Sequence, residues 1–105
     1  SALAHFRQSL QLRKQLEKHE DCAQSLEALA CGLIHTGSFE LAIQLLGAAH
    51  TTRAGARAAL TTFERGRLEP VLEVVRAACG EAVFRGWWAQ GQALTLAQAV
   101  TLALQ

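Results

Sequence analysis

The sequence predicts an all-α fold, and three of its features support that prediction. Half of the residues are hydrophobic, and Ala and Leu dominate them. Ala and Leu, like Gln, Glu and Arg, lose little conformational freedom on entering a helix. Apolar residues recur at three- and four-residue spacing along most of the chain, as they do on one face of a helix. Only one proline occurs, and no segment shows a convincing strand pattern.

Length and charge place the chain among small globular domains. Its 105 residues suffice for one domain with one modest core. A net charge of +1 gives no electrostatic argument for nucleic acid or membrane. No apolar run is long enough to span a bilayer. The three cysteines fit no close-spaced pairs, so we expect reduced thiols and a cytoplasmic protein. The chain begins at Ser1 and contains no methionine, so we expect a fragment of a longer protein.

The first half of the chain predicts three helices. The first covers roughly residues 2–18 and is followed by a break at "KHED". The second ends at Gly37, a favoured helix C-terminal residue. Ser38 is the expected N-cap of the third, which should fade in "HTTRAGAR" because of Gly55 and two threonines. The stripe of the second helix is Cys22, Leu26, Leu29 and Leu33, and that of the third is Phe39, Ala42, Ile43, Leu46 and Ala49.

The fourth helix is expected to end at Gly80, and its start leaves two alternatives open. Pro70 fits the first turn of a helix, where its missing N–H costs nothing. Alternatively, Thr61 and Glu64 form a capping box, and a longer helix kinks near Gly66 and Pro70. The expected inner face is Leu68, Val71, Leu72, Val75 and Cys79.

Three of the six aromatic residues lie within five positions of the fifth predicted helix. Phe84 and Trp88 are one turn apart, so we expect both to point inward and to anchor this helix on the fourth and sixth. Trp87 is rotated by about 100° from Trp88 and is expected to be the more exposed tryptophan. Thr95 and Gln98 have the spacing of a capping box and predict the start of the sixth helix.

Two segments 40 residues apart carry a similar pattern, which suggests stacked helix pairs. Ala2, Phe6 and Ser9 correspond to Ala42, Leu46 and Ala49. Residues 23–56 resemble a tetratricopeptide repeat, with Gly37 at its turn. Leu26, Leu29, Ala30 and Leu33 match the first helix of that repeat, and Phe39, Ala42, Leu46 and Ala49 match the second. The resemblance implies tetratricopeptide-like helical hairpins over 1–56 and C-terminal capping helices over 57–105, about six helices in all.

The remainder resembles the C-terminal end of large bacterial regulators. Those proteins join a signalling ATPase domain to tetratricopeptide-like repeats, often with a LuxR-type DNA-binding domain. The matching positions are Gly80, Glu81, Phe84, Trp88, Gly91, Leu94 and Ala99. These are packing positions, so the resemblance implies a protein-interaction scaffold in a bacterial transcriptional or signalling regulator and no enzyme.

Motifs for catalysis, metals and cofactors are weak in this sequence. His19, Asp21 and Cys22 could form a metal trio, but no second cluster completes a tetrahedral site. No phosphate-binding loop, paired-carboxylate signature or recognisable nucleophile motif is present. We therefore predict no catalytic residue, no metal and no cofactor.

The function favoured by the sequence is binding of a protein or peptide partner, including other domains of the parent chain. The first helix of each pair should line a concave surface, with Gln24, Glu27, His35 and Arg53 as candidate partner-binding residues. An alternative is a helical groove that senses a small-molecule inducer. A third reading is nucleic-acid contact through Arg53, Arg57, Arg65 and Arg67, although only Phe63 supplies an aromatic group nearby. A dimer is compatible with all three readings.

Overall fold

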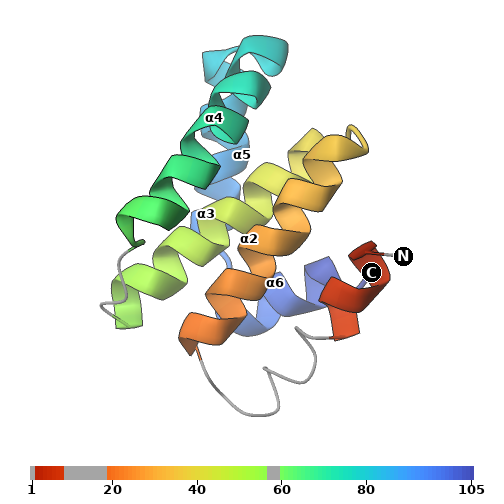
Figure 1. The fold of residues 1–105 in the computed structure, drawn as a ribbon, viewed down its shortest axis with the longest axis vertical. Helices are drawn as coiled ribbons and strands as arrows, with labels where there is room; N and C mark the ends of the chain where they lie inside the picture. Colours follow the sequence, from red (N-terminus) through yellow and green to blue (C-terminus); the bar gives the residue numbers. More distant parts are fainter. Residues whose placement is uncertain (1, 9–18, 57–59) are drawn as a thin grey trace.

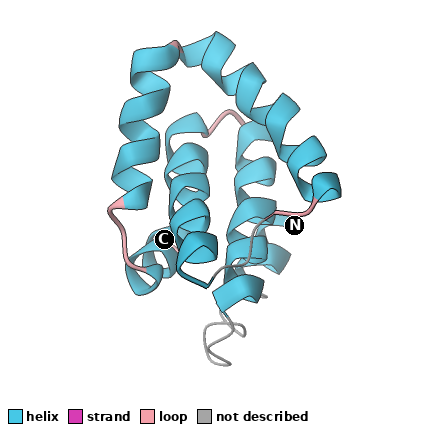
Figure 2. Cartoon of the chain, turned by 90° about the vertical axis from the view of Figure 1, so that its left-hand side faces the viewer, coloured by secondary structure: helices cyan, strands magenta, loops and turns pink. Residues whose placement is uncertain are grey.

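The computed structural model describes residues 2–8, 19–56 and 60–105 and confirms the all-α prediction. These described residues form helices joined by short turns, with no strand among them (Figures 1 and 2). None of their helices is both long and apolar enough to cross a membrane. A helix over 2–8 is followed by α2 (His19–His35), α3 (Phe39–Ala56), α4 (Thr62–Cys79), α5 (Glu81–Gln92) and α6 (Leu96–Ala103).

An antiparallel hairpin of α2 and α3 forms the centre of the molecule (Figure 1). A second hairpin, formed by α4 and α5, packs against the first one mainly through the contact of α5 with α3 (Figure 2). α6 contacts both α2 and α3. The helix over 2–8 is tied to α6 by a hydrogen bond of 3.1 Å from Arg7 Nε to the Ala103 carbonyl. Residues far apart in the sequence therefore close one end of the structure.

The turn between α2 and α3 explains why α2 ends where the sequence predicts. Gly37 adopts a φ of 85°, a left-handed conformation that side chains disfavour. The Ser38 amide donates to the Leu33 carbonyl at 2.9 Å, and the Gly37 amide donates to the Ile34 carbonyl at 3.1 Å. This pair of bonds is a Schellman motif, which satisfies the last carbonyls of a helix.

The core lies mainly between α2 and α3, with smaller contributions from the later helices. Small alanines let these two helices approach, and leucines fill the space beside them. α4 contributes only Val75 as a fully buried hydrophobic side chain, and α5 contributes Phe84. The larger members of the core are Leu26, Leu29, Ile43, Leu45, Val75 and Val100. The hairpin of α2 and α3 is thus the stable part of the fold, and α4 lies at its edge.

The contact between α3 and α5 depends on two glycines that face each other. A Cβ placed on Gly47 would lie 3.3 Å from Gly91 Cα and would collide with the Trp88 carbonyl. A Cβ placed on Gly91 would collide with the Gln44 backbone. The two helix backbones therefore touch directly. This corrects the expectation that α5 is anchored chiefly on α4 and α6, because α3 is its main partner.

α4 settles the question about Pro70. The helix begins at Thr62, and Thr61 and Glu64 form the capping box: Glu64 N donates to Thr61 Oγ1 at 3.1 Å, and Thr61 N donates to Glu64 Oε1 at 2.9 Å. Pro70 lies in the interior of α4 and not in its first turn, as the longer of the two alternatives requires. The second predicted capping box, Thr95 with Gln98, is also present at the start of α6.

Two predicted helix boundaries were wrong. The expected break at "KHED" is helical from His19 onward, and α2 starts there. α3 does not fade after His50 but continues to Ala56. The hydroxyl groups of Thr51 and Thr52 donate to carbonyls four residues earlier, so these side chains bond within the helix. The remainder of the predicted first helix, residues 9–18, lies outside the described residues, and so does Ser9 of the 40-residue comparison.

Candidate functional site

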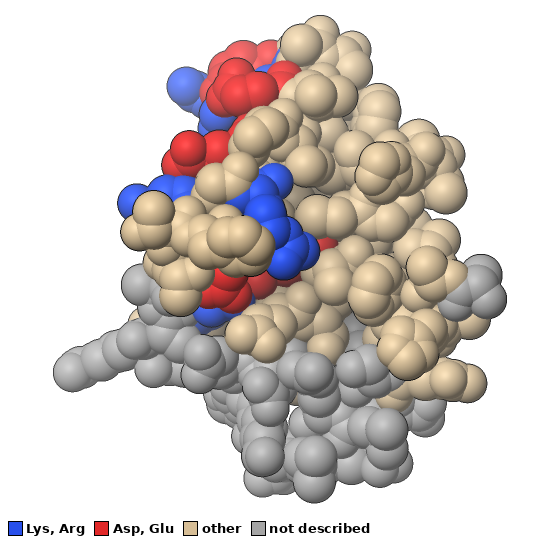
Figure 3. Space-filling view, viewed as in Figure 1, with Lys and Arg blue, Asp and Glu red and all other residues tan. Residues whose placement is uncertain are grey.

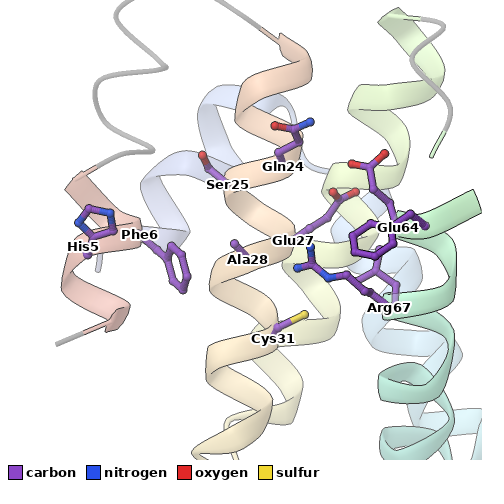
Figure 4. A pocket seen from close by; sticks show the side chains of 11 residues that line it. His5, Phe6, Gln24, Ser25, Glu27, Ala28, Cys31, Glu64 and Arg67 are labelled. Carbon is purple, nitrogen blue, oxygen red and sulfur yellow. The ribbon is translucent and has the colours of Figure 1, made fainter. Parts of the chain in front are cut away.

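Two hollows lie on either side of α4. The first, which we call the α2 groove, has a volume of about 520 Å³ and lies along α2 between the helix over 2–8 and α4. Figure 4 shows His5 and Phe6 on one side of α2, with Glu64 and Arg67 on the other. Gln24 is exposed above the groove. The α2 groove thus combines side chains from three segments that are far apart in the sequence.

An exposed aromatic residue stands at the α4 edge of the α2 groove. Phe63 is 73% exposed, the largest value among the exposed large hydrophobic residues described. The Arg67 guanidinium lies 5.8 Å from the centre of its ring, within reach of a cation–π interaction. Aromatic residues and arginines supply much of the binding energy at protein interfaces. This pair gives the groove the composition of an interaction surface.

Cys31 is the thiol in the α2 groove. Burial raises the pKa of this thiol, and that effect exceeds the opposing influence of the Arg67 guanidinium. Because the thiolate is the nucleophilic form, a raised pKa keeps the group unreactive near neutral pH. Neither Cys31 nor Cys79 forms a disulfide. The environment of Cys31 therefore does not activate it for nucleophilic catalysis.

A buried ion cluster, which we call the Arg53 clamp, joins α3 to α2 and α4. Arg53 Nε donates to Glu27 Oε2 at 2.7 Å, and Nη2 donates to Glu27 Oε1 at 2.8 Å. Nη2 also donates to Glu64 Oε2 at 3.2 Å. The Arg53 side chain is 5% exposed, Glu27 12% and Glu64 23%. The clamp is thus a bidentate, largely desolvated ion pair between Arg53 and Glu27, and Arg53 also binds the Glu64 carboxylate.

Glu64 serves both the clamp and the start of α4. Its carboxylate accepts a bond from the Thr61 backbone amide, and that bond contributes most to lowering the pKa of Glu64. The Thr61 side chain and Arg53 lower this pKa further. The ionised form is favoured, so Glu64 keeps its charge at the point where α4 meets α2 and α3.

The second hollow, which we call the α3–α4 pocket, has a volume of about 510 Å³. Its walls are mostly apolar, with Leu46 from α3, Leu68 and Leu72 from α4 and Trp88 from α5, and they also include Glu27 of α2 and Arg53 of α3. Glu27 and Leu68 line both hollows, so only the clamp and its neighbours separate them.

Trp88 takes a fixed position in the wall of the α3–α4 pocket. Its ring stacks on Phe84, with centroids 6.0 Å apart and an interplanar angle of 19°. His50 packs against it at a tilted angle, with centroids 5.5 Å apart. Phe84 is buried as predicted, but Trp87 and Trp88 are both half-buried. The aromatic cluster thus closes part of the core and also offers one indole to a pocket.

The structure places the four predicted partner-binding residues in different surroundings. Gln24 and Glu27 both line the α2 groove. Glu27 forms an ion pair with Arg53. Arg53 itself is buried and lines the α3–α4 pocket rather than the α2 groove. His35 is exposed in the last turn of α2 and lines neither hollow.

The predicted arginine cluster does not form one exposed patch in the described part of the chain. Arg53 is buried and neutralised by carboxylates, whereas Arg65 and Arg67 are exposed on α4. Arg57 lies outside the described residues. In Figure 3 positive and negative side chains alternate along the α4 flank, and the rest of the described face carries few charges. This mixed pattern differs from the continuous basic surface that binds a phosphate backbone.

No group of three metal-binding side chains converges among the residues that the structure describes. Of the trio considered from the sequence, Cys22 is buried in the core on α2, and the side chains of His19 and Asp21 lie outside the described part.

Comparison with known proteins gave no relatives. No family model, no curated protein and no solved structure matches this chain.

The sequence analysis named Arg67 and Phe63 only for the nucleic-acid alternative, and it did not identify Phe63, Glu64 and Arg67 as residues of a partner-binding groove. A signal for them was present, because the Thr61–Glu64 capping box places Phe63 and Arg67 four residues apart on one helix face. The pairing of Glu27 with Arg53 had no comparable signal, since it depends on how α2 and α3 align.

Proposed function

We propose that this chain is a non-catalytic protein-interaction scaffold, the C-terminal end of a helical-repeat array in a bacterial transcriptional or signalling regulator. The observation that carries this proposal is the α2 groove, open to solvent and edged by an exposed phenylalanine beside an arginine. Aromatic residues and arginines are enriched at protein interfaces, so an exposed phenylalanine beside an arginine at the edge of a groove supports a partner-binding role.

The partner is a protein or peptide segment, including a domain of the parent chain. Gln24 offers an amide donor and acceptor at the groove, and Arg67 offers a cation. Phe63 supplies the apolar anchor. Such a set combines one apolar anchor with polar groups that fix orientation, as protein interfaces do.

The lack of an activated group in the groove supports a binding role over catalysis. Burial raises the pKa of the Cys31 thiol, and the two carboxylates at the groove bind Arg53. These carboxylates hold helices together, so they are not poised for proton transfer.

Binding of purified variants to the remaining domains of the parent protein tests this function. Phe63→Ser and Arg67→Glu should each weaken binding about tenfold or more, because they remove the anchor or reverse the charge at the groove. Arg85→Glu is the matched control, since Arg85 is exposed on α5 away from the groove. Equal binding by all three variants, or no binding by the unmodified chain, would contradict the proposal.

A further inference from the structure

We infer that the first half of α4, residues 62–69, is a lid that opens by local unfolding and joins the α2 groove and the α3–α4 pocket into one continuous groove. We call this segment the α4 lid. Its opening is a property of the chain alone, so the inference does not depend on the binding role proposed for the α2 groove.

The α4 lid makes few apolar contacts with the rest of the molecule. None of its side chains is fully buried. Glu64 and Leu68 are half-buried, and Leu68 is the apolar side chain of the lid that packs against the core. The two hollows lie on either side of this segment. Segments with few buried apolar contacts are those that open at the lowest cost in free energy.

The second half of α4 is held more firmly. Val75 is fully buried, and Leu72 packs against the core. The Arg76 guanidinium lies 4.5 Å from the centre of the Phe84 ring, in cation–π contact with α5. The packing of α4 therefore changes from loose to firm along its length.

Pro70 lies where this change occurs. A proline has no N–H, so position 70 donates no bond to the Gly66 carbonyl one turn earlier. Gly66 is itself a poor helix former and has open space around it. Isolated helices shorter than about 12 residues are barely stable in water, so the lid unfolds once it leaves the body. The unfolding stops where the packing of α4 resumes.

An ion pair latches the lid to the body. Glu64 Oε2 accepts a bond from Arg53 Nη2 at 3.2 Å, and the Glu64 side chain is partly exposed to water. The two bonds from Arg53 to Glu27 do not involve the lid, so Arg53 stays paired when Glu64 leaves. Leu68 lines both hollows, and its departure together with Glu64 removes the wall between them.

The lid carries one edge of the α2 groove, because Phe63 and Arg67 both belong to it. A partner that contacts these two residues and α2 binds the closed form alone. Opening of the lid then raises the apparent Kd in proportion to the closed fraction that is lost. This regulatory consequence, unlike the opening itself, rests on the proposed function.

The test is native-state hydrogen exchange of the backbone amides, measured by NMR in increasing urea below the unfolding transition. The lid amides of residues 65–69, and those of 71–73 that donate to lid carbonyls, should exchange through an opening that depends little on urea. The amides of residues 75–79 should exchange through a urea-dependent opening and be at least about tenfold better protected. A gradual rise of protection along α4, without a step between 73 and 75, would indicate end fraying and overturn the inference.

Three variants separate lid opening from unfolding of the whole chain. Val100→Ala leaves a cavity in the core at α6 and should lower protection in α2 by at least about tenfold. It should leave the lid amides unchanged, because the closed and open forms both contain the cavity. Glu64→Gln can keep the capping box but loses the charged bond to Arg53, so protection of the lid should fall about tenfold.

Glu69→Gln is the matched control, since it removes an equal charge from an exposed position of the same segment. Protection of the lid should not change in this variant. Equal losses of protection in α2 and in the lid for Val100→Ala, or equal effects of Glu64→Gln and Glu69→Gln, would overturn the inference.

Discussion

Arg53 and Glu27 form a two-bonded ion pair between α3 and α2, with bond lengths of 2.7 and 2.8 Å. Both side chains are largely shielded from water. The pair holds the α2–α3 hairpin in register at the point where Glu64 attaches α4.

Removing the guanidinium group should destabilise the protein strongly. Arg53→Met leaves two carboxylates without their cation, and we expect a loss of about 3 kcal/mol in the free energy of unfolding. Urea unfolding followed by circular dichroism measures it. Arg85→Met, which breaks an exposed pair with Glu81, should cost less than about 1 kcal/mol. Equal losses for the two variants would show that the clamp does not hold the helices.

Removing Glu27 together with Arg53 should cost less than removing Arg53 alone. The double variant Glu27→Met with Arg53→Met no longer leaves Glu27 as an uncompensated buried charge, and apolar replacements of buried ion pairs are often nearly neutral. We therefore expect the double variant to recover at least about half of the single loss. A strictly additive double variant, measured in the same urea titration, would argue against direct coupling.

The Glu64 carboxylate predicts a pH dependence of stability. Its pKa in the folded protein lies below its usual value of about 4.5. The stabilisation is therefore fully present above pH 4.5 and is lost as the pH falls through the folded pKa. Urea midpoints measured at a series of pH values should fall more steeply below about pH 4.5 for the natural chain than for Glu64→Gln. Identical profiles for the two proteins would contradict this prediction.

The glycine contact between α3 and α5 should tolerate no added methyl group. Gly91→Ala forces the Gln44 backbone away, and we expect a loss of about 3 kcal/mol or more. Gly86 lies in the same helix with open space around it, so Gly86→Ala should be neutral or should stabilise by about 0.5–1 kcal/mol. Thermal unfolding of the two variants provides the comparison, and a tolerated Gly91→Ala would refute the direct backbone contact.

Pro70 should weaken α4. A proline in a helix interior removes the bond to the carbonyl four residues earlier and crowds that turn. Pro70→Ala should raise the free energy of unfolding by about 1–2 kcal/mol. The helix gains stability from the restored hydrogen bond, but the unfolded chain becomes more flexible without the proline, which offsets part of that gain. Unfolding in urea measures the change, and a destabilised Pro70→Ala would indicate that the proline ring is needed for packing.

The sequence predicted those features that depend on neighbouring residues. The helix end at Gly37 and the capping boxes at Thr61 and Thr95 require only a few residues each. The first and the last were predicted, and the Thr61 box was one of two alternatives that the sequence left open. The persistence of α3 to Ala56 was missed, because propensity counts Thr51 and Thr52 as weak helix formers. The buried neighbours Ala48, Ala49 and Arg53 hold this part of α3 against the rest of the structure, and that packing outweighs the local preference.

Features that depend on the alignment of distant helices could not be predicted in the same way. No local sequence signal marks Gly47 and Gly91 as contact residues, because they meet only where α3 and α5 cross. Likewise, Arg53 meets Glu27 only because α2 and α3 pair in one particular register. Arg53 was therefore interpreted as a partner-binding residue, although the structure buries it. The edge of the α2 groove at Phe63 and Arg67 likewise emerges only when α4 is set beside α2.

The most direct test of the scaffold function is backbone amide hydrogen exchange, followed by mass spectrometry, with and without the remaining domains of the parent protein. The account predicts that the partner slows exchange in α2 and in the first half of α4, which line the α2 groove together with the helix over residues 2–8. Exchange in α6, which lies outside the groove, should remain unchanged. Slowed exchange confined to α5 and α6, with α2 and α4 unaffected, would contradict it.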